Sequence, residues 1–425
     1  MKNQIRRYIY EHEKEAVSLV SHLVQQPSTR GDEGETQAIV VEKCRQLGLE
    51  IDLWELDDMP ELKKHPSYHC DRESFIGSPN LVAVLKGSGE GKSIILNGHI
   101  DVVPEGNRLD WSDSPYSGKV KDGKIYGRGT TDMKGGNVAL LMAIEALVKN
   151  NVKLKGDVIF QSVIEEESGG AGTLAAFLRG YKADGAIIPE PTNLKFFPYQ
   201  QGSLWFRLTI KGKSAHGGTR YEGVSSLDLS FEVIQAIKQL EKQRNQLLQN
   251  EPLYANIPIP IPINIGICQS GNWPSSVPDV TILEGRYGVS PYETIEEAMN
   301  VMEQMIVQLN EDNEWFCQKP VEFEWFGARW IPGKMETNHL LMQTLGENYR
   351  LVEQKEPIIE ASPWGTDGGI LSTLAYTPTI VFGPGTTNKA HDSDEYIEIE
   401  KMLKAAEIIA LTVMDWCEVE ESETG

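Results

Sequence analysis

The sequence predicts an α/β fold: a sheet with helices on both faces, interrupted by a smaller α+β domain. Strand and helix patterns alternate through the first part of the 425-residue chain and resume after residue 335. Between about 200 and 330 the order becomes strand, helix, strand, strand, helix, strand, which is typical of a ferredoxin-like unit. A chain of this length is also too long to fold around a single small core, so two domains are expected. We therefore expect a discontinuous larger domain, 1–199 with 331–425, and an inserted domain, 200–330.

The elements of the larger domain follow from apolar periodicity. Short apolar runs predict strands, and they are NLVAVLKG, SIILNG, DVIFQSVI, DGAIIP and TPTIVFG. Longer segments predict helices, and they are GGNVALLMAIEALVKN, AGTLAAFLRG, NHLLMQTLGENY and IEKMLKAAEIIALTVMDWC. In the first helix, Val138, Leu141, Ile144 and Val148 recur at helical spacing, so we expect one apolar stripe. The short tail EVEESETG has a composition typical of disorder.

The inserted domain has its own pattern. The expected elements, in order, are a strand Leu204–Lys211, a helix Val224–Asn250, strands Ile261–Gln269 and Val280–Val289, a helix Ile295–Asn310 and a strand Val321–Phe326. The first of its helices is rich in polar residues. It therefore suits either a small domain with much exposed area or one face of a dimer.

Charge and composition exclude several classes of protein. The chain has 40 Lys and Arg against 62 Asp and Glu, a net charge of −22, so it repels nucleic acid and anionic membranes. No apolar run is long enough to span a bilayer, and the first residues do not resemble a signal peptide. Five scattered cysteines without a CxxC pair favour a reducing cytoplasm and disfavour disulfides or a thiolate zinc site.

Polar side chains collect at the ends of the predicted strands. The group comprises His99, Asp101, Asp132, the run Glu165–Glu167, Glu190 and His391. Each lies at the carboxyl end of a strand expected to be parallel, or in the loop that leaves it. In open α/β sheets this edge is where binding sites form. His99 and Asp101 are also two residues apart, so in an extended chain they point to the same side.

These residue types suit a pair of divalent metal ions. Two imidazoles and three carboxylates form a nitrogen and oxygen set for zinc, cobalt or manganese, and they are His99, Asp132, Glu167, Glu190 and His391. With one carboxylate shared, they suffice for two ions about 3.5–4 Å apart. Glu166 is adjacent but is not needed as a ligand, which makes it the natural general base.

The motifs together resemble a known family. NGHIDVVPEG, GRGTTDMKGG, IEEESGGAGT, PEPT, GKSAHGG and KAHDSDEY look like the ordered motifs of the M20 metallopeptidases. That family contains acetylornithine deacetylases, succinyl-diaminopimelate desuccinylases, carboxypeptidase G2-like enzymes and aminoacylases. The resemblance extends over nearly the whole chain and implies a zinc-peptidase-like catalytic domain with an inserted domain. The long polar helix and the open strand edges of a ferredoxin-like unit suit pairing between two copies, so we expect a homodimer through residues 200–330.

The resemblance also implies roles for individual residues. One ion would be held by His99, Asp132 and Glu190, and the other by Asp132, Glu167 and His391, with Asp132 as the bridge. The resemblance implies that the two ions are zinc, with cobalt or manganese as alternatives, and that they would activate a water from which Glu166 takes the proton.

Three further features follow from the resemblance. Asp101 would orient His99, because a ligating imidazole usually gives its other N–H to a carboxylate. His216, in the inserted domain, resembles the family histidine that stabilises the developing oxyanion. A cis peptide bond is expected between Asp132 and Met133.

The sequence is compatible with several amide substrates. The leading interpretation is hydrolysis of an N-acylated amino acid or related small amine, as in acetylornithine deacetylase. The alternatives are a deformylase acting on a heterocyclic amine and a dipeptidase or carboxypeptidase, whereas the presence of Glu166 disfavours a non-catalytic scaffold. Arg286, Asn272 and Gly385 are the candidate substrate-binding residues, and Arg286 could hold a substrate carboxylate or simply face solvent.

One other segment has unusual composition. HPSYHCDRESF places His65, His69 and Cys70 close together. A third metal site is conceivable there, but a loop near the substrate entrance is the preferred interpretation.

Overall fold

The computed structural model describes residues 1–420 and divides the chain into two compact units. The larger unit contains Met1–Tyr199, Lys334–Glu360 and the segment from Ile370 onward, and the smaller contains Gln200–Gly333 and Ala361–Gly369. The sequence had assigned residues 361–369 to the larger domain. In the structure they pack with the smaller unit, where the side-chain amide of Gln201 donates to the carbonyl of Pro363. The last residues of the predicted tail, 421–425, lie outside the described part of the chain.

The main sheet of the larger unit has the order β1-β2-β6-β3-β7-β15-β8-β13, and β14 pairs with β8. Its strands are β1 (Glu50–Trp54), β2 (Asn80–Leu85), β3 (Ile94–His99), β6 (Val158–Val163), β7 (Ala186–Ile188), β8 (Phe196–Gln200), β13 (Gly333–Lys334), β14 (Ile359–Ser362) and β15 (Thr379–Val381). The central strands β6, β3, β7 and β15 are mutually parallel. The flanking strands β2 and β8 run antiparallel to them.

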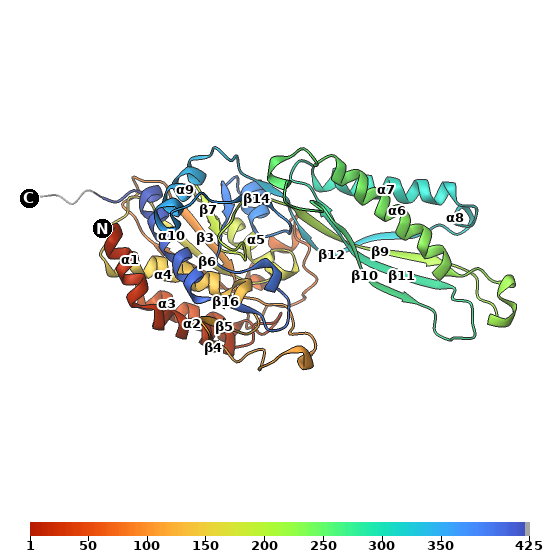
Figure 1. The fold of residues 1–425 in the computed structure, drawn as a ribbon, viewed down its shortest axis with the longest axis horizontal. Helices are drawn as coiled ribbons and strands as arrows, with labels where there is room; N and C mark the ends of the chain where they lie inside the picture. The colour runs from red at the N-terminus through yellow and green to blue at the C-terminus, as the bar shows by residue number, and fades with distance from the viewer. Residues whose placement is uncertain (421–425) are drawn as a thin grey trace, which may run out of the picture. The chain divides into compact units, whose positions relative to one another are not determined.

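Helices flank this sheet, as the sequence predicts (Figure 1). Two neighbouring residues of β3 show that helices lie on both faces, because successive residues of a strand point to opposite sides. The amide of Asn97 donates to Thr173 of α5 (Ala171–Leu178) at 2.8 Å. A Cβ at Gly98 would instead collide with Asn137 of α4 (Gly135–Lys149). Glycine at this position lets α4 approach the sheet.

Helix α4 is more deeply buried than predicted. The sequence suggested one apolar stripe, but all residues from Gly135 to Ile144 are buried. The reason is that α4 contacts β3 on one side and α1 (Lys2–Glu11), α2 (Glu13–Gln25) and α10 (Ile399–Cys417) on others. A helix enclosed on all sides is apolar around its circumference.

The remaining elements complete the larger unit. They are α3 (Gly34–Gln46), α9 (Leu340–Glu353) and a small antiparallel sheet of order β16-β5-β4, formed by Tyr396–Glu398, Lys124–Tyr126 and Lys119–Lys121. The amine of Lys134 is buried and donates to the carbonyls of Leu23 and Gln26 at the end of α2. Lysine at a helix C-terminus satisfies carbonyls that have no partner within the helix, and here it ties α2 to the loop that carries Asp132.

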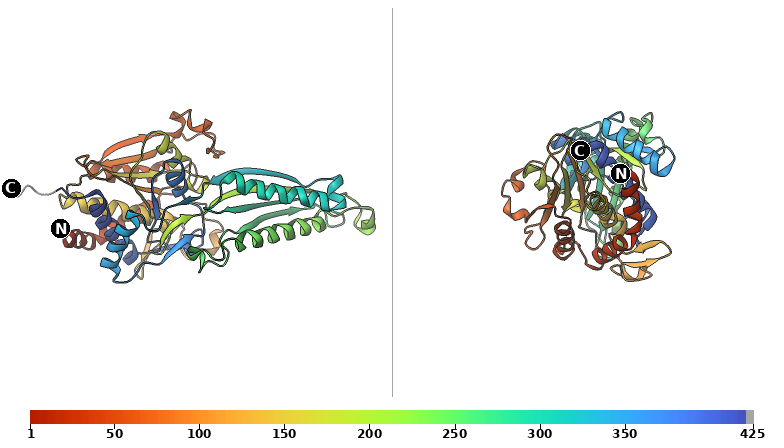
Figure 2. Two further views of the ribbon diagram at one scale, coloured as in Figure 1. Left: turned by 90° about the horizontal axis from the view of Figure 1, so that it is seen from above. Right: turned by 90° about the vertical axis from the view of Figure 1, so that its left-hand side faces the viewer.

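The smaller unit has the predicted ferredoxin-like fold. Its sheet has the order β10-β11-β9-β12, with every pair antiparallel. The elements are β9 (Gly202–Lys211), α6 (Ser226–Gln246), β10 (Ile263–Ser270), β11 (Val280–Val289), α7 (Ile295–Asp312), α8 (Glu314–Gln318) and β12 (Glu322–Trp330). Helices α6 and α7 lie side by side on one face of this sheet (Figure 2).

Alternation along β9 explains the one-sided core. Leu204, Phe206 and Leu208 are buried against the helices. Trp205 and Arg207, which alternate with them, point to the other face, where Arg207 pairs with Glu284 of β11.

No helix in the described residues is long and apolar enough to cross a membrane.

Candidate metal centre

The five predicted metal ligands lie at one edge of the main sheet. His99 is the last residue of β3, and Glu167 and Glu190 lie four and two residues after the ends of β6 and β7. Asp132 precedes α4, and His391 lies in the segment after β15. Because β3, β6, β7 and β15 are parallel, their carboxyl ends meet at the same edge.

The distances divide the five side chains into two groups that share Asp132. The Nε2 atom of His99 lies 3.2 Å from Oδ1 of Asp132 and 3.7 Å from Oε1 of Glu190. The Nε2 atom of His391 lies 3.3 Å from Oδ2 of Asp132 and 3.1 Å from Oε1 of Glu167. The two oxygens of Asp132 therefore face two different histidines, which is the arrangement expected of a bridging carboxylate.

Glu166 also lies within reach of a metal ion. One group of potential ligands whose donor atoms lie within 4.8 Å of one another contains His99, Glu166 and Glu190, and another contains His99, Asp132 and Glu167. Proximity alone therefore does not separate a base from the ligands. The role of Glu166 as the base remains a prediction, and the Glu166→Gln experiment below tests it.

The backbone around these residues has uncommon conformations. The peptide bond between Asp132 and Met133 is cis, as the family resemblance implied. Glu165 and His391 have φ angles of 63° and 62°, in the left-handed region that side chains other than glycine seldom adopt. Such conformations persist only where the surroundings hold them, and they cluster at functional sites.

The electrostatics of the cluster fit two divalent cations. Among the described residues, Asp132, Glu167 and Glu190 form ion pairs with histidines and not with lysine or arginine. Burial, together with the charge of Asp132, raises the pKa of Glu190 well above its ordinary range. Hydrogen bonds from His391 and His99 overcome the effect of burial and hold the pKa of Asp132 far below its ordinary value. Crowded carboxylates and imidazoles of this kind, with His99 and Glu190 buried and His391 exposed, suit a two-metal site.

Asp101 contacts His99 in a different way from the one predicted. The Nδ1 atom of His99 lies 2.8 Å from the backbone carbonyl of Asp101, whereas the carboxylate is 3.6 Å away. The carboxylate instead accepts the backbone N–H groups of Glu166 and Glu167, at 3.4 and 3.1 Å. The main-chain carbonyl of Asp101 is therefore the nearer partner of His99, and the side chain of Asp101 holds the turn after β6.

An ion pair that the sequence reasoning missed connects three of the site loops. Arg128 and Glu395 are both buried and lie 2.6 Å apart. Glu395 accepts the backbone N–H of Asp132 at 3.2 Å, and Arg128 donates to the carbonyl of His391 at 3.4 Å. Arg128 also donates to the carbonyl of Pro104. The pair thus supports the backbone of both Asp132 and His391.

The predicted substrate-binding residues lie in different places. Gly385 is buried in the larger unit against the backbone of Thr131, where a Cβ would collide with that carbonyl, so its observed role is close packing beside Asp132. Asn272 is exposed in the loop between β10 and β11 of the smaller unit. Arg286, on β11, donates to the side chain of Gln201 at 3.3 Å, and burial lowers the pKa of Arg286 to about 10.

His216 lies in the smaller unit and is exposed. Its Nδ1 atom accepts the backbone N–H of Gly218 at 3.0 Å. In the neutral ring the proton therefore sits on Nε2, which is left as a hydrogen-bond donor. This is the protonation that stabilisation of an oxyanion requires.

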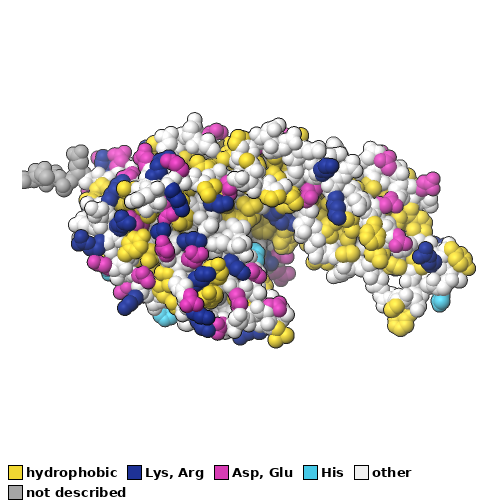
Figure 3. All heavy atoms as spheres, in the orientation of Figure 1, with side chains coloured by type: hydrophobic (Ala, Val, Ile, Leu, Met, Phe, Trp, Pro, Cys, Tyr) yellow, Lys and Arg dark blue, Asp and Glu magenta, His cyan; other side chains and the backbone are white. Residues whose placement is uncertain are grey.

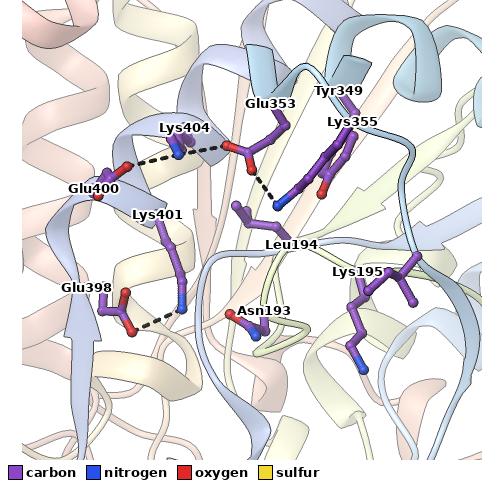
Figure 4. Close-up of a pocket in the computed structure, with 11 residues that line it drawn as sticks. Asn193, Leu194, Lys195, Tyr349, Glu353, Lys355, Glu398, Glu400, Lys401 and Lys404 are labelled. Atoms are coloured by element: carbon purple, nitrogen blue, oxygen red, sulfur yellow. Dashed lines mark hydrogen bonds and ion pairs between the residues drawn. The ribbon is translucent and has the colours of Figure 1, made fainter. Parts of the chain in front are cut away.

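Two other features of the larger unit do not resemble a metal or anion site. Within the described residues, no group of potential metal ligands includes His65, His69 or Cys70. A separate pocket of about 290 Å³ is lined by Lys195, Lys355, Lys401 and Lys404 (Figure 4). Each of these lysines is paired with a glutamate, at 2.7–3.0 Å, so the pocket has no free positive charge for an anion.

The grouping of ligands leads to a prediction about metal affinity. We expect Glu167→Ala and His391→Ala each to lower the affinity for the same ion by at least about 10²-fold. Mutating a residue that only supports a ligand already lowers metal affinity about 10–100-fold. Glu190→Ala should weaken the other ion. Anomalous diffraction at the zinc edge identifies which position each variant empties. The partition is wrong if Glu167→Ala and His391→Ala empty different positions.

Comparison with known proteins identifies the class. The sequence matches the model of Peptidase family M20/M25/M40 over residues 95–415, so the chain belongs to this family. The relatives of this chain include a deformylase and a desuccinylase, which are hydrolases. The protein is a metal-dependent amidohydrolase.

Individual relatives extend over most of the chain. The sequence is 28% identical to N-formyl-4-amino-5-aminomethyl-2-methylpyrimidine deformylase of Halalkalibacterium halodurans, covering 99% of this chain and 98% of that protein. It is 29% identical to a probable succinyl-diaminopimelate desuccinylase of Staphylococcus aureus, covering 77% and 84%. A crystal structure of an S. aureus tripeptidase matches the fold with a TM-score of 0.72 at 23% identity, covering 95% of this chain and 98% of that chain.

Proposed function

We propose that this enzyme removes the formyl group from an N-formylated aminomethyl heteroaromatic amine. The observation that supports this most is the similarity to a deformylase, which extends over 99% of this chain and so spans both units. The sequence had favoured an acetylornithine deacetylase-like activity and had kept a deformylase as an alternative. Both activities hydrolyse an amide and need the same metal-centre residues.

The side chains of this site would perform the hydrolysis in distinct roles. Two divalent ions, which we propose to be zinc, would activate water and polarise the acyl oxygen. Glu166 would take the proton of the water and deliver it to the leaving amine. His216 would donate from Nε2 to the oxygen of the developing oxyanion. Asp101 would hold the main chain of Glu166, and so its side chain, in place.

A second candidate is supported by Arg286. Among the described residues this guanidinium has no carboxylate partner, and its side-chain hydrogen bond is to the neutral Gln201. A guanidinium kept free in this way suits a substrate that carries a carboxylate, because Arg binds carboxylates through two parallel hydrogen bonds. N-acyl amino acids have such a group, whereas an aminomethyl heteroaromatic amine does not.

A panel of substrates separates these candidates. N-formyl, N-acetyl and N-succinyl amines, N-acyl amino acids and dipeptides would be assayed with added zinc or cobalt. We expect the highest kcat/KM on an N-formyl aminomethylpyrimidine, with Arg286→Met altering it less than about threefold. If N-acyl amino acids are preferred and Arg286→Met raises their KM about 10–100-fold, the size of a lost charged hydrogen bond, the deformylase proposal is wrong.

We further propose a cytoplasmic homodimer formed through the smaller unit. The exposed apolar residues Leu227 and Phe231 of α6, and Ile267 of the edge strand β10, support this proposal. Figure 3 shows apolar side chains grouped on the visible face of this unit, whereas charges of both signs are interspersed on the larger one. An edge strand presents unpaired backbone groups that a second copy can pair with. Scattered cysteines, which form no disulfide within the described residues, support the cytoplasmic location.

A further inference from the structure

Glu165 is the one member of the glutamate run after β6 to which the proposed mechanism gives no role. We propose that Glu165, Arg30 and Arg72 form an ion cluster that positions Glu166 and Glu167, and that ties the segment 65–79 to the metal centre. Arg30 and Arg72 are thus positioning residues that act through Glu165. The proposal rests on the roles proposed above for Glu166 and Glu167. The test distinguishes a wrong positioning role from a wrong assignment of those two residues.

The carboxylate of Glu165 is fully enclosed by donors. Its side chain has no exposed surface. Arg30 donates through Nε to Oε2 at 2.9 Å, and Arg72 donates through Nη1 to Oε1 at 2.8 Å. The thiol of Cys70 donates to Oε2 at 3.2 Å. Each carboxylate oxygen therefore has an arginine partner, which fixes the side chain in one orientation.

The cluster reaches into two other segments. Arg72 also bonds Glu33 at 3.0 Å, and Glu33 is likewise fully buried. Both buried carboxylates therefore have an arginine partner, which is the condition under which buried charges are tolerated. Arg30 also pairs with the exposed Asp71 at 2.6 Å. Arg72 further donates to the hydroxyl of Ser78 and the carbonyl of Ser74, at 2.8 Å each. Arg72 therefore holds its own segment as well as Glu165.

The cluster supports a turn whose backbone is otherwise uncommon. Glu165 has a φ of 63°, and its carbonyl accepts the N–H of Gly170 at 2.8 Å. This left-handed residue turns the chain out of β6, so that Glu166 and Glu167 reach the metal edge. The turn is held from both sides: the arginines bind the side chain of Glu165, and Asp101 binds the N–H groups of Glu166 and Glu167. A rotation at Glu165 would displace both following carboxylates.

The segment that contains Cys70 and Arg72 depends on the same cluster. The sequence had placed this segment near the substrate entrance, and the structure gives it no metal-ligand group among the described residues. Its contacts with Glu165 come through Cys70 and Arg72, and Arg30 donates to the sulfur of Cys70 at 3.2 Å. One buried carboxylate therefore connects this segment to the turn that carries Glu166.

The test compares Glu165→Gln with a more exposed ion pair elsewhere in the larger unit. Arg179 binds Asp52 through two hydrogen bonds, at 2.6 and 2.8 Å, and links β1 to the end of α5. Zinc affinity at each position would be measured by calorimetric titration, together with kcat and Tm. We expect Glu165→Gln to weaken the ion held by Glu167 about 10–100-fold and to lower kcat by a similar factor. The affinity for the ion held by Glu190 should change less than threefold. Asp52→Asn should lower Tm without changing either affinity.

Two further variants keep the result interpretable. Arg72→Lys retains the positive charge and the fold but cannot donate through a planar guanidinium. It should therefore also lower the affinity for the ion held by Glu167, by a smaller factor than Glu165→Gln does. Arg30→Lys acts on the other carboxylate oxygen of Glu165 and should weaken binding of the same ion. If Glu165→Gln and Arg72→Lys weaken both ions equally and only in proportion to the fall in Tm, or change neither, the positioning role is wrong.

Glu167→Ala, measured in parallel, separates this proposal from the ligand assignment. If Glu167→Ala releases an ion that Glu165→Gln retains at full affinity, only the positioning role is wrong. If Glu167→Ala itself releases no ion, the ligand assignment fails, and positioning of a ligand by Glu165 is overturned with it.

Discussion

Glu166→Gln is expected to lower kcat by at least about 10²-fold while the protein keeps both metal ions. The loss of a general base has this magnitude, because the proton of the attacking water then has no acceptor in the transition state. Glutamine has the shape of glutamate, so the turn held by Asp101 should persist. KM should change little, since the substitution removes a contribution to the transition state and not to binding.

The measurement pairs steady-state kinetics with metal analysis of the purified variant. Glu166→Asp is the matched control, because it retains a carboxylate but shortens its reach, and its activity should lie between those of the wild type and the glutamine variant. The structure places Glu166 with His99 and Glu190 within metal-binding distance, so a ligand role is the specific competitor. Loss of one ion in Glu166→Gln, or turnover close to that of the wild type, would show that the base has been assigned to the wrong residue.

The fold was predictable where each element carries its own periodic signal. The strand Val280–Val289 was located to the residue, and the order of elements in the smaller unit identified its topology. Helix α4 was predicted as a helix with one buried stripe, yet it is buried on nearly all sides. Its enclosure depends on α1, α2 and α10, which come from both ends of the chain. The position of 361–369 in the smaller unit depends in the same way on tertiary contacts.

The candidate site was predictable because parallel strands bring their ends to one edge. His99, Glu167, Glu190 and His391 were collected because they end or follow predicted strands, and Asp132 because its loop leads into the helix that became α4. The residues that support them were not predictable by that rule. Arg30 and Glu165 are 135 positions apart, and Arg128 and Glu395 are 267 apart. Such pairs exist only after folding, and arginine and glutamate are common enough on surfaces that neither stands out in the sequence.

The contacts of Asp101 show a limit of a different kind. The spacing of His99 and Asp101 correctly placed them together, but a spacing rule cannot tell a backbone carbonyl from a carboxylate. The carboxylate turned out to hold Glu166 and Glu167, so the two glutamates are constrained by Asp101 on one side and by the Glu165 cluster on the other. The residues that orient the proposed base are therefore more numerous than the motif alone suggested.

His216→Ala is expected to lower kcat about 10²–10³-fold without loss of metal, which is the effect of removing one donor to an oxyanion. The residue is exposed, its Nε2 is free to donate, and it belongs to the unit through which we propose that two copies pair. In a dimer it can serve either the site of its own chain or that of the partner. We expect it to serve the partner, because the smaller unit is where the two chains would meet.

Mixing two inactive variants distinguishes these arrangements. His216→Ala retains Glu166, and Glu166→Gln retains His216, so each variant lacks a different half of the site. If His216 acts in the partner, a mixed dimer contains one complete site, and activity should return to about half that of the wild type per mixed dimer. If it acts in its own chain, neither site in the mixed dimer is complete. Each variant incubated alone is the control, and subunit exchange would be verified by native mass spectrometry of differently tagged chains. Verified exchange without any recovery of activity would rule out action on the partner, because every mixed dimer would then contain the two halves and still fail to combine them.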